Sequence, residues 1–150
     1  MAVERERKFL IINELLPEFS ESHHINHVYL PAGNALSLRI RIMDNTAYLN
    51  IKGPDDQGVR PEFEFRISLE EAEEMIASFK TSVLRKIRHI IYFEGYKWEV
   101  DEFLEENKGL WLAEVEYKSA DEIIPLPTWI AKEVTGNPRY LNSNLAKAKN

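Results

Sequence analysis

The residues best suited to chemistry come first in this chain: five charged side chains, Glu4 to Lys8, directly precede the apolar Phe9. On a β-strand alternate side chains point to one face, so Glu4, Glu6 and Lys8 would form a row about 13 Å long. In such a row two carboxylates could hold a divalent cation, and the ammonium could hold a phosphate oxygen. The row is either an ordinary set of exposed ion pairs or one wall of a site, and partner rows elsewhere decide between the two.

Charged or polar residues two positions apart recur in six further segments, usually with apolar residues between them. Arginine pairs and glutamate pairs are sorted into different segments, whereas a solvated sheet face would mix threonine, serine, lysine and glutamate. The rows are Arg39 and Arg41; Tyr48, Asn50 and Lys52; Arg60, Glu62, Glu64 and Arg66; Lys86 and Arg88; Glu99 and Asp101; Glu114 and Glu116. Exposed ion pairs would explain any single row, but the full set favours a charged interior.

Periodicity and turn signals predict the elements that position these rows. Apolar and polar residues alternate in most segments, and Gly, Pro, Asn or Asp separates many of them. The predicted strands cover 3–12, 25–30, 35–43, 46–52, 59–67, 82–93, 97–103 and 110–117. Short antiparallel strands joined by tight turns predict an α+β protein, mainly β, folded as a barrel or a sandwich.

A change to helical spacing after the fifth strand predicts one main helix. Ser68 and Glu71 form a capping box, and apolar residues recur every three or four positions over 69–79. The other predicted elements are a polar loop over 20–26 and short helices over 119–125, 128–135 and 142–149.

The bulk composition indicates a single folded domain, residues 1–150, with 44% hydrophobic and 29% charged residues. The net charge of −6 argues against nucleic acid as a partner, beyond a nucleotide. The chain has no cysteine, which excludes disulfides and thiolate metal sites. No apolar run reaches membrane-spanning length and the N-terminus is not signal-like, so we expect a cytoplasmic protein without a membrane partner.

The charged rows would line a polar binding site if the sheet closes with them inside. A wide eight-stranded barrel would enclose a polar tunnel, and helices could cover the apolar faces that point outward. Arginine forks bind phosphate oxygens, and carboxylates bind Mg²⁺ or Mn²⁺, which also bridge phosphate oxygens. The rows therefore predict a tunnel for a polyphosphate chain held together with divalent cations.

The order of these motifs resembles the CYTH superfamily, the triphosphate tunnel metalloenzymes, over nearly the whole chain. The family's ExExK signature matches Glu4 to Lys8. The motifs that follow are RxR at 39–41, the tunnel lysine at 52, ExE at 62–64, KxR at 86–88, a WxxDxF-like segment at 98–103 and ExE at 114–116. Asn50 is a departure, because many relatives have threonine before the tunnel lysine, and it bears on substrate preference more than on activity.

The resemblance implies an eight-stranded antiparallel tunnel and metal-dependent work on triphosphates. Family members hydrolyse inorganic tripolyphosphate, nucleoside triphosphates, RNA 5′-triphosphate ends or thiamine triphosphate, and one branch cyclises ATP. We expect a triphosphatase acting on inorganic tripolyphosphate, because a small chain has few appendages to recognise a base or thiamine. The alternatives are a class IV-type adenylate cyclase, a thiamine triphosphatase, and a polyphosphate- or nucleotide-binding module without turnover. The protein is expected to be a monomer or a homodimer.

Site roles are carried over from the resemblance residue by residue. The phosphate-binding residues would be Lys8, Arg39, Arg41, Lys52, Arg60, Lys86 and Arg88. The ligands of Mg²⁺ or Mn²⁺ would be Glu4, Glu6, Glu62, Glu64, Asp101, Glu114 and Glu116, with water positioning or salt bridges as the alternative for Glu62, Glu64 and Asp101. The catalytic residues would be Glu4, Glu6, Lys8, Tyr29 and Glu116. A contact between Tyr29 and Lys8 requires the first two strands to pair, and a structural tyrosine is the alternative.

A histidine cluster offers a different kind of site. His23 and His27 would share one face of a helix and could bind zinc, although no third ligand is fixed nearby.

Overall fold

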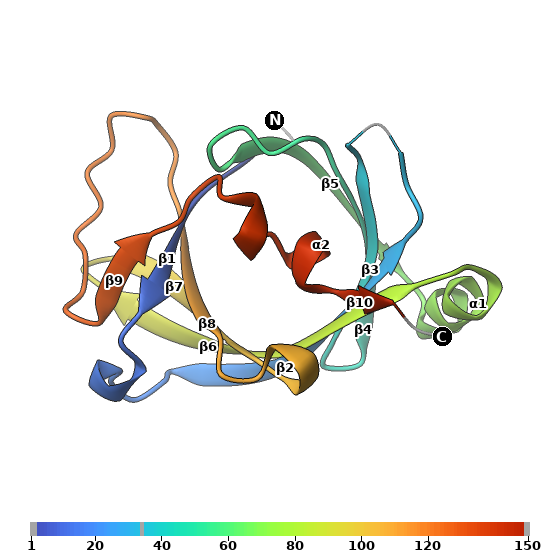
Figure 1. Cartoon of the computed structure of the whole chain (residues 1–150), viewed down its shortest axis with the longest axis horizontal. Coiled ribbons are helices and arrows are strands. Elements are labelled where there is room, and N and C mark those ends of the chain that lie inside the picture. The colour runs from blue at the N-terminus through green and yellow to red at the C-terminus, as the bar shows by residue number, and fades with distance from the viewer. Residues whose placement is uncertain (1–2, 34, 149–150) are drawn as a thin grey trace.

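Antiparallel strands form a closed barrel in the computed structural model, which describes residues 3–33 and 35–148 (Figure 1). The barrel strands are β1 (Val3–Ile11), β2 (Glu21–Leu30), β3 (Ser37–Met43), β4 (Thr46–Lys52), β5 (Val59–Ile67), β6 (Ser82–Phe93), β7 (Tyr96–Phe103) and β8 (Trp111–Glu116). Their order around the barrel is β6, β2, β3, β4, β5, β1, β8 and β7, and β7 closes the ring by pairing with β6. The predicted α+β barrel of eight antiparallel strands is confirmed.

Tight hairpins fix which side chains stand next to each other inside the barrel. Asp44 and Asn45 both have positive φ, 49° and 64°, as a two-residue type I′ turn requires. The register that follows sets Arg39 of β3 opposite Asn50 of β4. Because side chains alternate along a strand, this turn places the polar sides of both strands on the same face.

Apolar side chains form the core on the outside of the barrel. One cluster contains Phe9, Trp98 and Trp129, and the two indole rings meet edge to face at 5.5 Å. The segments that follow β1 and β8 pack against this cluster, so irregular chain rather than helices covers it. Phe63 and Phe65 on β5 remain 49% and 52% exposed, which shows that the outer apolar face is only partly covered.

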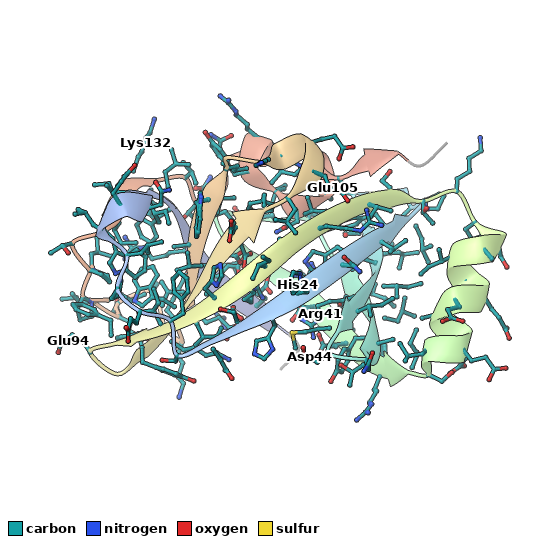
Figure 2. All side chains as sticks on the ribbon, turned by 90° about the horizontal axis from the view of Figure 1, so that it is seen from below. His24, Arg41, Asp44, Glu94, Glu105 and Lys132 are labelled. Atoms are coloured by element: carbon teal, nitrogen blue, oxygen red, sulfur yellow. The ribbon has the colours of Figure 1, made fainter. Side chains whose placement is uncertain are left out.

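The main predicted helix is confirmed as α1 (Leu69–Ser78), which lies beyond one end of the long, oblique strands β2 and β6 (Figure 2). The Ser68 hydroxyl accepts the Glu71 N–H at 3.0 Å, and the Glu71 carboxylate accepts the Ser68 N–H at 3.1 Å. Ala72 is fully buried in the cluster that this helix forms with β3 and β4.

The helix predicted over 128–135 is wrong, because the chain there forms strand β9 (Ile130–Glu133) on the edge of β1. β5 pairs with β1 only at Val3, Glu4 and Arg5. The later part of β1 would therefore expose backbone donors and acceptors on that side, and β9 satisfies them.

Two further local predictions are wrong. No helix forms over 119–125, because Glu122 accepts the Lys118 N–H at 2.8 Å and the Tyr96 hydroxyl instead of capping a helix. Residues 21–26 are part of β2 rather than a loop, since β6 continues to pair with them as far as Glu21. Alternation of apolar residues did not predict this part of the strand, because most of its side chains are polar.

The C-terminal part of the described chain folds back over the barrel opening (Figure 1). The helix predicted over 142–149 is a single turn, α2 (Asn142–Leu145), preceded by the 3-10 turn η3 (Pro138–Tyr140). It ends in β10 (Lys147–Ala148), which pairs with β6. The other 3-10 turns are η1 (Asn13–Leu15) and η2 (Glu105–Asn107). Of the helices in the described chain, none has the length and apolar character needed to cross a membrane.

Candidate active site in the barrel interior

The polar rows meet in a cavity of about 210 Å³ inside the barrel. All its lining side chains are charged except one amide. They are Glu4, Glu6, Arg39, Arg41, Lys52, Arg60, Glu62, Glu64, Lys86, Arg88, Glu99, Glu114, Glu116 and Asn142. Six basic groups and seven carboxylates share this small space, so the charge state of each depends on its neighbours.

Most of the predicted site residues line this cavity, and three do not: Lys8, Tyr29 and Asp101. Two lining residues, Glu99 and Asn142, had no predicted role. Glu99 belongs to a charged row that is visible in the sequence. No motif marks Asn142, which lies in the segment that folds back over the opening.

Carboxylates gather along three neighbouring strands because of their register. β1 and β8 set Glu6 opposite Glu116, and β8 and β7 set Glu114 opposite Glu99. Glu4 continues the row along β1. We call these five residues the acidic wall.

A glycine allows the loop before β5 to press against the acidic wall. The Glu6 N–H donates to the Gly58 carbonyl at 3.0 Å. Gly58 has φ of +86°, and a Cβ there would lie 2.2 Å from the Glu6 carbonyl oxygen. Only glycine fits this close approach, which fixes the backbone of Glu6.

Repulsion between carboxylates distinguishes the acidic wall. Burial raises the pKa of Glu6 well above its usual value of 4.5, and Glu114 and Glu4 raise it further. Burial alone would raise the pKa of Glu114 too, but Lys8, the hydrogen bond with Glu6 and Arg88 hold it well below 4.5. Glu6 is therefore the protonated member of this pair, and Glu114 is the ionised one.

The acidic wall has the donor chemistry of a site for a hard divalent cation. Burial raises the pKa of Glu116, and Glu99 and Glu4 raise it further, so negative charge is in excess here. Within residues 3–33 and 35–148, no three His, Cys, Asp or Glu side chains are placed as the ligands of one ion. Mg²⁺ commonly takes only one or two carboxylates and completes its shell with water and substrate phosphates, so close pairs such as Glu6 and Glu114 fit it.

One buried carboxylate anchors the basic side chains of β6 from behind. Asp101 accepts two guanidinium nitrogens of Arg88 at 2.8 Å each and the Lys86 ammonium at 2.7 Å. Both carboxylate oxygens of Asp101 thus accept hydrogen bonds from Arg88 or Lys86, and Asp101 does not line the cavity. These contacts are the salt bridges that were the alternative to a metal-ligand role for this residue. Burial and Arg88 lower the pKa of Lys86 to about 8 although Asp101 opposes this shift.

An amide connects the basic side chains of β3 to β5. The Arg39 Nε donates to the Asn50 Oδ1 at 3.1 Å, and the Asn50 Nδ2 donates to Glu64 at 2.8 Å. Glu64 also pairs with Arg41 at 2.9 Å. Arg39 is 6% exposed and forms no ion pair with a carboxylate of the described chain. Its buried positive charge is available to an anionic ligand.

Ion pairs at one end of the cavity join basic and acidic groups. The Lys52 Nζ lies 3.2 Å from Glu4 and 2.9 Å from Glu62, and the Arg60 Nε lies 3.3 Å from Glu4. Burial would raise the pKa of Glu4, but Lys52 and Arg60 lower it overall. We use the name basic wall for the six cavity-lining cations: Arg39, Arg41, Lys52, Arg60, Lys86 and Arg88.

Lys8 lies beneath the cavity rather than on its surface. Its Nζ donates to the Tyr140 carbonyl at 2.9 Å, and the residue is 7% exposed. The space between Lys8, Glu6 and Leu141 measures about 10 Å³, which is too small for a phosphate group. A phosphate contact by Lys8 stays a prediction.

The first two strands do not pair, so the condition for a contact between Tyr29 and Lys8 is not met. β2 lies between β3 and β6, whereas β1 lies between β5 and β8. Tyr29 stands opposite Arg39 and lines a separate pocket of about 500 Å³, which shares only Arg60 with the charged cavity. No hydrogen bond links Tyr29 to Lys8 in the part of the chain that is described, so the catalytic role of Tyr29 also stays a prediction.

The hypothesis of a histidine zinc site is wrong, because these residues lie on β2 and no ligand group forms around them among the described residues. His23 bonds to Asp44 at 2.6 Å. His27 is 1% exposed, and neither ring nitrogen has a hydrogen-bond partner in the described chain. Burial lowers the pKa of His27 well below 6.5, and Arg39 and Lys86 add to this shift. His27 is thus a buried, neutral side chain near the basic wall.

Comparison with known proteins gives a consistent result. The model of the CYTH domain family matches residues 2–147. A curated relative, an inorganic triphosphatase of Acetivibrio thermocellus, is 38% identical over 148 residues, which are 98% of this chain and 95% of the relative. The crystal structure of the inorganic triphosphatase NE1496 is similar with a TM-score of 0.69 and 28% identity, covering 97% of this chain and 95% of that one. A conserved hypothetical protein from Pyrococcus furiosus matches with a TM-score of 0.59 and 27% identity, over 79% of this chain and 80% of its own. With a charged barrel interior and a family match over nearly its whole length, this chain belongs to the CYTH domain family.

Proposed function

We propose that this protein hydrolyses the terminal phosphoanhydride of a small triphosphate, inorganic tripolyphosphate in the first place, with Mg²⁺ or Mn²⁺ as the cofactor. The observation that carries this proposal is the cavity itself, whose lining is charged throughout apart from Asn142. An enclosed space of this kind fits a ligand that is both polyanionic and accompanied by cations.

The charge balance of the cavity supports dependence on a metal. Its lining has six basic groups against seven carboxylates, so the basic wall alone does not offset a polyanion that enters. Divalent cations that enter with the phosphates would restore the balance. Glu4, Glu6, Glu114 and Glu116 are the residues that would hold them, with Glu62 and Glu64 close to the basic wall as further candidates.

The chain's own residues divide the work of hydrolysis. The basic wall would hold phosphate oxygens and offset charge on the leaving pyrophosphate. The raised pKa of Glu116 suits a general base that takes the proton of the attacking water. The water oxygen would attack the terminal phosphorus in line while the bond to the bridging oxygen breaks. Bound Mg²⁺ or Mn²⁺ would supply Lewis acidity at the phosphate oxygens and a more acidic water.

Lys8 and Tyr29 would act from outside the cavity. Lys8 lowers the pKa of Glu114 and so helps to keep that carboxylate ionised for a cation. Tyr29 lies opposite Arg39 and could orient it. We expect Tyr29→Phe to lower turnover, and an unchanged turnover would return Tyr29 to a structural role.

One observation favours nucleoside triphosphates as second substrates. The pocket of about 500 Å³ beside Arg60 is lined in part by apolar side chains such as Leu36, Leu38 and Pro54, and an organic group could occupy it. We propose that the protein acts as a monomer or a homodimer.

A substrate panel tests the proposal. Purified protein is incubated with tripolyphosphate, pyrophosphate, ATP, GTP or thiamine triphosphate, each with Mg²⁺ and with Mn²⁺, and phosphate and cyclic AMP are measured. We expect phosphate release, fastest from tripolyphosphate. Cyclic AMP from ATP would indicate the cyclase, and binding without release at any pH would indicate a binding module.

A further inference from the structure

The C-terminal segment closes one end of the charged cavity. We define the C-terminal plug as residues 138–146, which comprise η3, Leu141, α2 and Ala146 and lie across the barrel opening (Figure 1). Asn144 donates to the Pro138 carbonyl at 2.7 Å, and Asn107 donates to the Leu145 carbonyl at 2.9 Å. The plug is therefore fixed both internally and to the barrel.

The plug ends the polar path through the barrel. Leu145 and Ala146 belong to an apolar cluster whose buried members include Leu84, Phe103 and Leu112. A polyphosphate cannot pass through such a cluster, because desolvation of its charges would have no compensation. The space beside Lys8 is only about 10 Å³, so a phosphate cannot pass between Lys8 and the plug.

Asn142 is the one plug residue that reaches the charged cavity. It is 9% exposed, and its Oδ1 accepts the Lys86 Nζ at 3.1 Å. This bond fixes which end of the amide faces Lys86. The Nδ2 group makes no hydrogen bond within the described residues, although it can donate two. A free amide donor thus stands at the closed end, next to a cation of the basic wall.

The size of the cavity limits the polyphosphate that it can hold. Along β5 the lining residues run from Arg60 to Glu64, which at 3.3 Å per residue spans about 13 Å. The strands β1, β3, β4, β6, β7 and β8 contribute one or two lining residues each, and β2 contributes none of those that line the cavity. A short polyphosphate fits such a length, whereas a longer one would have to extend beyond the charged lining.

We propose that Asn142 determines chain-length specificity: its Nδ2 donates to the innermost phosphate, and the plug behind it stops longer polyphosphates from advancing. This inference rests on the proposed hydrolysis of tripolyphosphate in the same cavity. It makes Asn142 a substrate-binding residue whose removal changes which chain length is preferred, beyond any effect on Lys86.

The test compares kcat/KM for linear tripolyphosphate and tetrapolyphosphate with Mg²⁺ in the wild type and three variants. The wild type should prefer tripolyphosphate. Asn142→Ala removes the innermost donor and frees the volume of its side chain in front of the plug, so we expect the ratio of tetrapolyphosphate to tripolyphosphate kcat/KM to rise about tenfold. Asn142→Asp keeps the shape and the bond to Lys86 but sets a negative charge against the phosphate, so KM for tripolyphosphate should rise about tenfold. Asn144→Ala changes a plug side chain that does not line the charged cavity and leaves the apolar cluster of Leu145 and Ala146 in place, so it should leave the ratio unchanged.

Distinct outcomes overturn this inference and the proposed function. If Asn142→Ala and Asn142→Asp lower turnover of both chain lengths equally, Asn142 only supports Lys86 and the inference fails. If the wild type cleaves tripolyphosphate, tetrapolyphosphate and longer chains equally well, the inference also fails while the hydrolase remains. If the wild type does not cleave tripolyphosphate at all, the proposed function fails instead. Should Asn142→Ala not fold by circular dichroism, the isosteric Asn142→Asp variant decides.

Discussion

The acidic and basic walls of the cavity differ in how far their charges are satisfied. On the basic wall, Lys86 and Arg88 are fixed by Asp101, and Arg39 and Arg41 are connected through Asn50 and Glu64. On the acidic wall Glu4, Glu99 and Glu114 have basic partners, whereas burial and neighbouring carboxylates raise the pKa values of Glu6 and Glu116. Ion pairs and hydrogen bonds thus hold the basic wall in place, whereas part of the acidic wall has an excess of negative charge that a cation would offset.

Removing an acidic-wall carboxylate should have the largest effect, a loss of activity without a loss of stability. Glu116→Ala should reduce phosphate release about 10²–10⁴-fold, because a general base contributes about that much. Its melting temperature should not fall, since the change relieves repulsion. Glu70→Gln, on the solvent side of α1, is the control. A variant with near wild-type turnover would remove Glu116 from the chemistry.

Removing the anchor of the basic wall should affect stability. Asp101→Asn leaves Lys86 and Arg88 buried without their carboxylate, which should lower the free energy of unfolding by about 3–5 kcal/mol. Urea denaturation measures the change. The exposed pair of Arg85 with Glu105 is a matched control, and Glu105→Gln should change stability by less than about 1 kcal/mol. Equal effects of the two substitutions would contradict the anchoring role.

The pH dependence of stability should also separate the walls. The pKa of Glu6 is raised on folding, so folding takes up a proton, and this contribution is complete below pH 4.5 and is lost as pH rises through the raised pKa. Asp101 has a lowered pKa because Arg88 and Lys86 outweigh its burial, so its contribution is lost as pH falls below its usual range. In metal-free protein, Glu6→Gln should flatten the decline of melting temperature above pH 4.5. Added Mg²⁺ should flatten the same decline of melting temperature in the wild type. An identical decline in the wild type and in Glu6→Gln would contradict the assignment of a raised pKa to Glu6.

The smallest effect is expected from the amide between β3 and β5. Asn50→Thr keeps a hydrogen-bonding group but shortens the link between Arg39 and Glu64, which is a loss of about one hydrogen bond. We expect KM for tripolyphosphate to rise about fivefold with little change in kcat. A change in kcat larger than that in KM would mean that Arg39 acts on the transition state instead of the ground state.

Local patterns were sufficient to predict the barrel and most of its lining. Alternation placed Arg39, Arg41, Glu114 and Glu116 on inward faces, and the capping box located α1, because both signals depend on neighbours in sequence. β9 was missed because a strand of four residues forms there only when the edge of β1 is free. That condition arises from the closed barrel and has no local signature.

The same reasoning explains where the cavity lining differs from the expected one. Lys8 shares its strand face with Glu4 and Glu6, but the plug covers it, and alternation says nothing about a segment that folds back from far along the chain. Asn142 could not be recognised for the same reason. Asp101 follows the alternation of its strand, yet its full burial depends on Lys86 and Arg88 from the neighbouring strand.

The contacts of β1 with segments late in the chain also affect how the protein folds during synthesis. The Lys8 amide donates to Thr135, 127 residues later, and β8 provides the ladder partner of Glu6. A nascent chain still emerging from the ribosome would hold the later part of its first strand without partners until most of the sequence had been synthesised, because β5 pairs only with Val3 to Arg5. Contacts of such long range favour slow, all-or-none assembly. We therefore expect both walls to appear together when synthesis ends, and a fragment that lacks β8 to have neither.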